Sequence, residues 1–266
     1  MICAIVLAAG ESRRMGTQKL LLPFAGQTVI GHVVDQALGT GDLRSERWHG
    51  RETGPQPSET GPQQRDDIHG APISQVLVVV SEQGDEIRLA LAGKPVTFLA
   101  NPDPASDMLN SVRCGLRALP AGCTGVLVVL GDQPAIQLQL IRDIVRTFET
   151  TASLSENRLR RGGQSAFVPP INAAMVPAQK GTVPDGFRRI VVPVHLGSRG
   201  HPILFSADYA AELLTNHDGI GLRGLLKAHA DEIHLVDVAD PAVLSDIDYP
   251  EDYRRELARL LDAERK

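Results

Sequence analysis

The segment that decides the fold reads ICAIVLAAGESRRMGTQK, residues 2–19. Its first part, Ile2–Leu7, is apolar without alternation, which is typical of a strand covered on both faces in a parallel sheet. The turn that follows contains Gly10 and Gly16, whose backbones can adopt dihedral angles that other residues avoid. We therefore predict a strand with a ligand-binding loop at its carboxyl end, where open α/β sheets bind ligands.

Further apolar runs follow along the chain, and segments with helical periodicity separate them. The apolar runs are Val76–Val80, Val96–Leu99, Val126–Leu130, Ile190–Val194 and Ile233–Val238. The helical segments are Val29–Leu38, Glu86–Leu91, Ser111–Leu119, Leu138–Phe148, Ala207–Leu214, Leu222–His229 and Glu251–Leu261. This alternation predicts an α/β fold with three layers, αβα, around a mostly parallel sheet.

Two segments interrupt the alternation. Gly39–Pro72 holds 6 Gly, 4 Pro and 10 charged residues, so it buries too little apolar surface to offset the entropy of ordering. We expect it to be a disordered insertion. Residues 151–189 contain Arg-, Gly- and Pro-rich pieces that predict an irregular surface excursion. Residues 1–266 are therefore expected to form one domain, enlarged by the insertion 39–72 and the excursion 151–189.

Composition narrows the class of protein. The 266 residues carry 27 Lys and Arg against 32 Asp and Glu, a net charge of −5, whereas a dedicated nucleic-acid binder would carry a basic stripe. Cys3, Cys114 and Cys123 form no C-x-x-C pair, which fits a reducing cytosol. The apolar runs are too short to cross a bilayer, and no signal-peptide pattern precedes the first strand. We expect a cytoplasmic protein with neither nucleic acid nor membrane as a partner.

The loop after the first strand suits a polyphosphate ligand. Successive backbone N–H groups in such a turn form an anion nest, and Arg13 and Lys19 add positive charge. The loop is neither a P-loop, which needs G-x-x-x-x-G-K-[ST], nor a G-x-G-x-x-G dinucleotide fingerprint. Composition alone also allows an ordinary strand-to-helix turn with solvated basic residues.

Leu7–Pro23 reads L-A-A-G-x-S-x-R-M-G-x-x-K-x-L-L-P without a gap. This pattern resembles the signature of the molybdenum-cofactor nucleotidyltransferases, which belong to the wider glycosyltransferase-A-like NTP transferases. The resemblance implies a Rossmann-like nucleotide-diphospho-sugar transferase fold whose loop wraps a nucleoside triphosphate. The nucleotide-binding residues that it implies in the loop are Leu7, Ala8, Ala9, Gly10, Ser12, Arg13 and Lys19. It makes Arg13 and Lys19 catalytic, and the L-A-A-G form, as opposed to L-A-G-G, favours CTP over GTP.

Acidic residues at two places are candidates for a metal site. Asp132 ends a predicted strand in the sequence G-D-Q-P, where a carboxylate suits Mg²⁺, although an Asp before a Pro-containing turn is also common. Residues 246–253 read D-I-D-Y-P-E-D-Y, in which Asp248 could cap a helix with Glu251 closing a capping box. The resemblance implies that Asp132 and Asp248 bind one Mg²⁺ and that Asp132 is catalytic, with Asp246 as a further candidate.

The remaining signatures concern the acceptor and the base. The sequence G-S-R-G-H-P, residues 197–202, resembles the acceptor motif of the cytidylyltransferase branch. The acceptor-binding residues that this implies are Arg199, Gly200 and His201. A guanidinium suits phosphate because it donates two parallel hydrogen bonds, and the backbone here is also typical of a hairpin with a glycine turn. Asn101 and Ser111 match residues that line the base and ribose, although Ser111 also suits the N-cap of a helix.

The reaction that the resemblance implies is Mg-dependent transfer of CMP from CTP to the phosphate of molybdopterin. Pyrophosphate is released and the cytosine dinucleotide form of the cofactor is made. A phosphomonoester is largely ionised near neutral pH, so no general base is needed. Two alternatives stay open: a guanylyltransferase or other NTP transferase with a different phosphorylated acceptor, and a non-catalytic cofactor-binding chaperone. The protein partner suggested by the resemblance is a molybdoenzyme or a cofactor-insertion chaperone.

Overall fold

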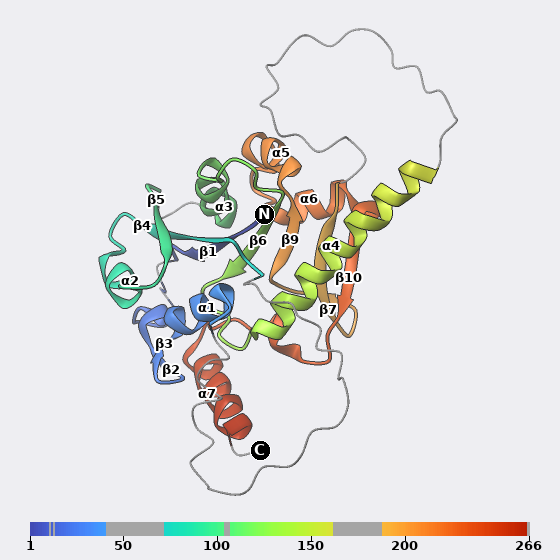
Figure 1. Ribbon diagram of the computed structural model, residues 1–266. Coiled ribbons are helices and arrows are strands. Elements are labelled where there is room, and N and C mark those ends of the chain that lie inside the picture. Colours follow the sequence, from blue (N-terminus) through green and yellow to red (C-terminus); the bar gives the residue numbers. More distant parts are fainter. Residues whose placement is uncertain (11, 13, 41–71, 104–106, 162–187, 265–266) are drawn as a thin grey trace, which may run out of the picture.

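The main sheet is built around β1, residues Ile2–Ala8, which has a parallel neighbour on each side (Figure 1). The computed structural model describes residues 1–10, 12, 14–40, 72–103, 107–161 and 188–264. The other strands in this part of the chain are β2 (Pro23–Phe24), β3 (Gln27–Thr28), β4 (Gln75–Ser81), β5 (Val96–Asn101), β6 (Gly125–Leu130), β7 (Ile190–His195), β8 (Ser198–Arg199), β9 (Ile203–Ser206) and β10 (Ile233–Asp237). Strands β2 and β3 form a small hairpin outside the main sheet.

The main sheet is mixed but mostly parallel. Its order is β10-β7-β9-β6-β1-β4-β5, with β8 paired to β7. Strand β9 is antiparallel to both of its neighbours, β6 and β7, and β8 forms an antiparallel hairpin with β7. The predicted mostly parallel α/β sheet is therefore confirmed, as is the hairpin at the G-S-R-G-H-P motif. Strand β9 was not predicted as a separate strand.

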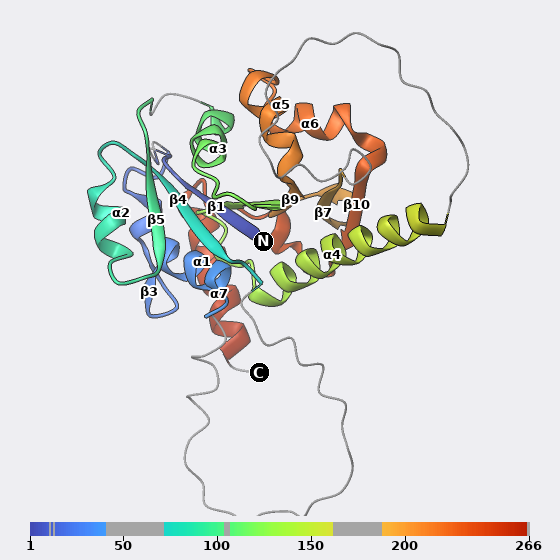
Figure 2. The same cartoon turned by 45° about the horizontal axis from the view of Figure 1, so that its top comes forward.

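Helices cover both faces of the sheet, which confirms the three layers (Figure 2). The helices are α1 (Val29–Leu38), α2 (Asp85–Ala90), α3 (Met108–Arg117), α4 (Leu138–Arg161), α5 (Ala210–Thr215), α6 (Leu222–Ala228) and α7 (Pro250–Glu264). One core joins α1, α2, α4 and α7 to the sheet, and a second core joins α3, α5 and α6 to its other face. In β1, Ala4 and Val6 belong to the first core and Ile5 to the second, which explains why this strand is apolar without alternation.

The predicted excursion at 151–189 is wrong in its first part, because α4 continues to Arg161. The hydroxyls of Thr147 and Thr151 donate to the carbonyls of Asp143 and Thr147 over 2.8 and 2.9 Å. These polar side chains are thus satisfied within the helix, one turn back. Residues 41–71 and 162–187 lie outside the described residues, so the single domain and its disordered insertion 39–72 stay predictions. Among the described helices, none is long and apolar enough to span a membrane.

Candidate functional site

The carboxyl ends of β1 and β6 and the turn before α7 meet at one edge of the sheet. Gly131 follows β6, and a Cβ atom at this position would lie 2.6 Å from the carbonyl oxygen of Leu7. Only glycine therefore allows this close approach of the two strand ends. The backbone N–H of Ile247 donates to the carbonyl of Asp132 over 3.0 Å. This bond holds the C-terminal segment beside β6.

Lys19 joins the two predicted metal ligands. Its Nζ donates to Oδ2 of Asp132 over 2.6 Å and to Oδ1 of Asp248 over 3.1 Å. The side chain of Lys19 is 12% exposed. Burial alone would lower the pKa of Lys19, but the charges and hydrogen bonds of Asp132 and Asp248 outweigh burial and raise that pKa above 10.5. The ammonium is therefore charged at neutral pH.

Asp246 adds a third carboxylate to this edge. Burial raises the pKa of Asp246 above its ordinary value of 3.8, and the negative charges of Asp132 and Asp248 raise it further. Repulsion among carboxylates indicates a place where a cation is favoured. Within the described residues, no three His, Cys, Asp or Glu side chains are grouped closely enough to hold a metal unaided. The donor set of Asp132 and Asp248 fits Mg²⁺, which binds through one or two carboxylates and takes phosphate oxygens and water as its other ligands.

Ser12 gives the glycine-containing loop its shape. Its φ of 51° lies in the left-handed region, which non-glycine residues seldom adopt. Its hydroxyl accepts from the backbone N–H of Lys19 over 3.1 Å and donates to Oε1 of Gln18 over 2.8 Å. Its carbonyl accepts from the N–H of Met15 over 3.0 Å. The loop thus turns back on itself at Ser12, whereas Arg13 lies outside the described residues.

A cavity of about 330 Å³ opens beside Lys19 and the acidic residues. Eight predicted site residues line this cavity: Leu7, Ala9, Gly10, Lys19, Asn101, Ser111, Asp132 and Asp246. Ala8 is 2% exposed and lies in the first core. Most of the residues predicted to bind the nucleotide therefore surround one space, although they come from β1, β5, α3 and β6 and the segments that follow them.

Asn101 and Ser111 contact each other at this cavity. Nδ2 of Asn101 donates to Oγ of Ser111 over 3.0 Å. Helix α3 begins at Met108, and the side chain of Asp107 accepts from the backbone N–H of Asn110 over 3.1 Å. The alternative that Ser111 caps this helix is therefore wrong, because Asp107 already does so one turn earlier.

The turn before α7 also differs from its prediction. The backbone N–H groups of Asp248 and Tyr249 both donate to Oδ2 of Asp252, over 3.1 and 2.8 Å. The carboxylate of Asp248 instead accepts from the side chains of Lys19 and Arg14. The predicted capping box is therefore wrong: the first turn of α7 is stabilised by Asp252, one residue beyond the predicted acid, and Asp248 remains part of the charged cluster.

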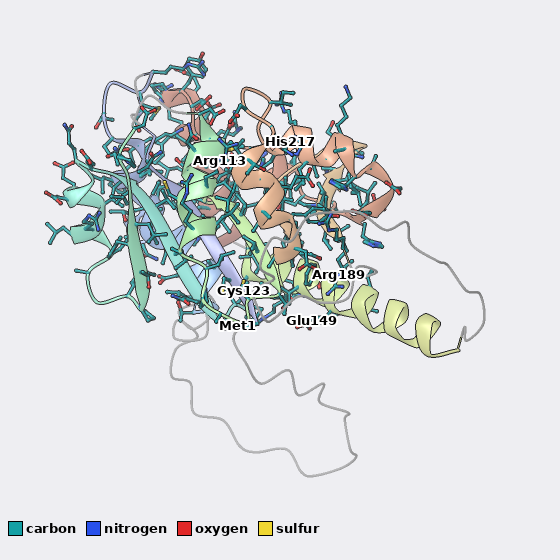
Figure 3. All side chains as sticks on the ribbon, turned by 90° about the horizontal axis from the view of Figure 1, so that it is seen from above. Met1, Arg113, Cys123, Glu149, Arg189 and His217 are labelled. Carbon is teal, nitrogen blue, oxygen red and sulfur yellow. The ribbon has the colours of Figure 1, made fainter. Side chains whose placement is uncertain are left out.

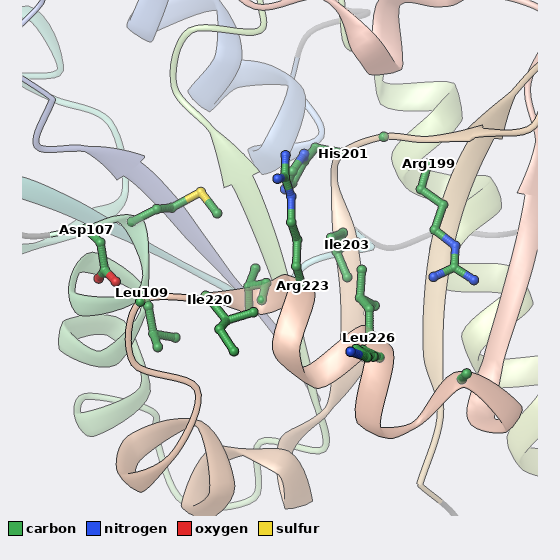
Figure 4. A pocket seen from close by; sticks show the side chains of 15 residues that line it. Asp107, Leu109, Arg199, His201, Ile203, Ile220, Arg223 and Leu226 are labelled. Carbon is green, nitrogen blue, oxygen red and sulfur yellow. The ribbon is translucent and has the colours of Figure 1, made fainter.

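A second cavity, of about 800 Å³, adjoins the first, because Asp107 and Met108 line both. Its lining includes the predicted acceptor residues Arg199, Gly200 and His201 (Figure 4). A Cβ atom at Gly200 would lie 2.2 Å from the carbonyl oxygen of Val243. The N–H of His201 donates to that carbonyl over 3.0 Å. The motif therefore needs glycine at 200 because its backbone packs directly against the segment before α7.

Charged side chains at both cavities affect the pKa of His201. Burial lowers its pKa below the ordinary value of 6.5, the charge of Asp132 opposes this, and the charge of Arg223 adds to it. Nε2 of His201 is buried and has no hydrogen-bond partner among the described residues. Arg223 and Lys227 on α6 also line the second cavity, and neither was predicted as a site residue from the sequence. Their i, i+4 spacing on a predicted helix was the available signal.

The loop between α5 and α6, which lines the second cavity, is tied to α3 by Arg113. The Arg113 Nε atom donates to the carbonyl of Leu213 over 2.8 Å, and Nη2 donates to the carbonyl of Asn216 over 2.9 Å. Figure 3 shows Arg113 and His217 near each other on this side of the molecule. Helix α3 also carries Ser111 of the first cavity, so one helix positions parts of both cavities.

Replacing Glu212 by Gln is expected to lower the free energy of unfolding by about 1–2 kcal/mol at pH 7. The Glu212 carboxylate accepts from Nε2 of His217 and of His229 over 2.7 and 2.9 Å. Burial would raise the pKa of Glu212, but these hydrogen bonds outweigh burial and hold that pKa below 4.5. An acid with a lowered pKa stabilises the fold fully above its ordinary pKa, and this contribution is lost as the pH falls through the lowered value.

Urea unfolding of wild type and Glu212→Gln between pH 3 and pH 7 measures this effect. The difference in unfolding free energy is expected to shrink below pH 4.5. Glu251→Gln, at a position 69% exposed, is the control and is expected to stay near wild type. A difference for Glu212→Gln that is the same at every pH would contradict the assigned hydrogen bonds to the carboxylate.

Known proteins resemble this chain along most of its length. The family model described as MobA-like NTP transferase domain matches residues 4–45 and 63–233. Molybdenum cofactor cytidylyltransferase of Escherichia coli (strain K12) is 22% identical over 254 residues, which cover 95% of this chain and 93% of that protein. Bifunctional protein GlmU of Kineococcus radiotolerans is 35% identical over 136 residues, which cover 50% of this chain and 21% of that protein.

Solved structures have the same fold. The manganese complex of Rv0371C from Mycobacterium tuberculosis H37Rv has a TM-score of 0.59 and 21% identity, and the match covers 97% of this chain and 98% of that chain. The family model includes the glycine loop, Asp132 and the acceptor motif, whereas Asp246 and Asp248 lie beyond its matched residues. The chain therefore belongs to the MobA-like NTP transferase domain family, which makes it a nucleotidyltransferase.

Proposed function

We propose that this chain transfers CMP from CTP to the phosphate of molybdopterin, releasing pyrophosphate and forming the cytosine dinucleotide cofactor. The L-A-A-G form of the loop and the G-x-R-G-H-P motif at 197–202 support CTP and molybdopterin by resemblance. The E. coli relative that matches 95% of the chain carries this activity in its name.

The observation that carries the proposal is the lining of the second cavity. It combines cationic side chains with apolar ones such as Met108, Ile220 and Leu226. Among the described residues that line it, none is Ser, Thr, Asn, Gln or Tyr. The hydroxyls of a sugar phosphate would have only the charged side chains and the backbone as hydrogen-bond partners in this cavity. The lining suits a phosphorylated ligand with a flat ring system that packs against these apolar side chains, and the pterin has such a ring system.

In the proposed reaction a phosphate oxygen of the acceptor attacks the α-phosphorus of CTP. A bond forms between them as the bond to pyrophosphate breaks. Lys19, held charged by its acidic neighbours, lies at the cavity assigned to the nucleotide and neutralises charge on the α-phosphate. Arg13 is assigned the same role by resemblance. The loop and α3 orient the nucleotide, and the His201 motif orients the acceptor, so positioning and charge neutralisation supply the rate.

Asp132 and Asp248 are the residues proposed to hold Mg²⁺. When bound, this ion would neutralise charge on the triphosphate and on the leaving pyrophosphate. The manganese in the Rv0371C structure is consistent with a divalent ion in this fold. No general base is assigned, because the acceptor phosphate carries its own negative charge near neutral pH.

Pyrophosphate release, measured with each of the four NTPs with and without molybdopterin, tests the proposal. We expect release with CTP and molybdopterin together, abolition by a chelator, and a preference for CTP over GTP of about tenfold or more in kcat/KM. Ala9→Gly should narrow that preference, because Ala9 lines the first cavity.

Other outcomes identify the alternatives. A preference for GTP would make the chain a guanylyltransferase, and release with a hexose phosphate in place of molybdopterin would change the acceptor. Binding of molybdopterin without pyrophosphate release from any NTP would indicate a non-catalytic carrier. Each of these results would overturn the proposal.

A further inference from the structure

Two further basic side chains line the second cavity beside the predicted acceptor residues. Arg223 and Lys227 lie four positions apart on α6 and therefore project from the same face of the helix. Both line the cavity together with Arg199. In Figure 4 the side chain of Arg223 extends from α6 toward His201. Three basic side chains from two separate segments thus surround one space.

These basic side chains have no acidic partners within the part of the chain that the structure describes. Other cations in that part do: Nζ of Lys19 lies 2.6 Å from Oδ2 of Asp132, and Nη1 of Arg113 lies 2.6 Å from Oδ1 of Asp218. Like charges one helical turn apart repel each other. An anionic ligand that enters the cavity would remove this repulsion and gain charge-assisted hydrogen bonds.

Arg223 is the basic side chain of α6 that lies near His201. His201 responds to the charge of Arg223 on one side and to that of Asp132 on the other. Arg223 is therefore close enough to His201 to act on it. Of the two cations on α6, Arg223 is the one whose side chain extends toward His201.

Helix α6 is held in place by its buried leucines, and it supports Arg223. Leu222, Leu225 and Leu226 are buried in the second core. A Cβ atom at Gly224 would lie 2.5 Å from Nδ1 of His217, so the helix packs closely against the loop that Arg113 fixes. A charged side chain on such a supported element is preorganised to bind its ligand.

We propose that Arg223 binds the acceptor phosphate that attacks the nucleotide, and that Lys227 supplies a second, weaker attraction for the same anionic ligand. The identity of the acceptor rests on the proposed function. The cavity itself indicates an anionic ligand, and the phosphomonoester follows from the proposed function. Arg223 is thus a substrate-binding residue, because a guanidinium orients a phosphate through two parallel hydrogen bonds.

Initial-rate kinetics with CTP and molybdopterin test this assignment. Arg223→Gln is expected to raise the KM for the acceptor roughly ten- to a hundredfold, the usual effect of losing a charged hydrogen-bonding group. The KM for CTP should stay within about twofold. Arg223→Lys should recover part of the loss, since it restores the charge without the paired hydrogen bonds. Lys227→Gln should raise the acceptor KM by a smaller factor.

Arg117→Gln is the matched control, because Arg117 is exposed on α3 and does not line either cavity. It should behave as wild type. An acceptor KM of Arg223→Gln within twofold of wild type would overturn the proposal. Since Arg223 is itself exposed, the substitution should leave the fold intact, and Arg223→Lys gives a second measurement if it does not.

A binding measurement separates this inference from the proposed function. The unfolding temperature of the full chain is measured in the presence of a saturating non-hydrolysable CTP analogue. It is compared with and without inorganic phosphate, which is the probe. Phosphate should stabilise wild type and Arg117→Gln but not Arg223→Gln. If this holds while wild type does not turn over molybdopterin, the proposed function fails and the inference stands. If turnover occurs but phosphate stabilises Arg223→Gln as much as wild type, the inference fails.

Discussion

Replacing Asp132 by Asn is expected to lower kcat by about a thousandfold or more. Asn preserves the size of the side chain at the end of β6. It removes the negative charge that lies 2.6 Å from Nζ of Lys19 and that is proposed to bind Mg²⁺. A hard cation prefers charged oxygen ligands, so the variant loses both the metal and its effect on the triphosphate. Pyrophosphate release at saturating CTP and acceptor measures the loss.

The fold should survive the replacement of Asp132. Its side chain is 20% exposed, and its backbone carbonyl, which accepts from Ile247, is unchanged. Circular dichroism and thermal unfolding check this. Asp85→Asn, at a position 93% exposed on α2, is the control and should retain the wild-type rate. Undiminished turnover by a folded Asp132→Asn variant would remove Asp132 from the catalytic machinery.

Replacing Lys19 by Met is expected to lower kcat/KM for CTP roughly a hundred- to a thousandfold. Met is similarly long and unbranched, so the change removes chiefly the positive charge. That charge lies beside the first cavity and is kept at neutral pH by Asp132 and Asp248. Without it, the charge that develops on the α-phosphate during transfer has one fewer partner. Steady-state kinetics with varied CTP measure the loss.

The unfolding temperature of Lys19→Met supplies a second measurement. Without the ammonium, Asp132 and Asp248 repel each other, so the metal-free variant should unfold at a lower temperature than wild type. Added Mg²⁺ should raise this temperature by more than it does for wild type. Lys94→Met is the control, because Lys94 pairs with Asp35 away from both cavities, and its loss of stability should not respond to Mg²⁺. An equal Mg²⁺ response in Lys19→Met and wild type would contradict the proposed metal site.

Local patterns were sufficient for most of the fold. All six predicted strands and seven predicted helices are present in the structure. They could be predicted because an apolar run or a helical period reports directly on which faces of a segment are buried. Strand β9, which has four residues, escaped prediction. Its place between β6 and β7 depends on pairing partners that are distant in sequence.

Helix ends were predicted less well than helix positions. Asp107, not Ser111, caps α3, and Asp252, not Glu251, stabilises the start of α7. Each of these side chains could accept from a free backbone N–H group, so composition alone did not distinguish them. The structure decides because the backbone enters each helix from a direction set by the strand or loop before it.

The sequence by itself determined the α/β class, the glycine loop and the residue types suited to a triphosphate and a divalent ion. It did so because backbone burial and loop conformation depend on residues that are neighbours in the chain. Only the tertiary structure brought Lys19 to Asp132 and Asp248, which are 113 and 229 positions away. It alone placed Arg223 in the same cavity as His201. Charges act through space, so their effect on one another follows from the packing of the sheet and its helices, which no local pattern contains.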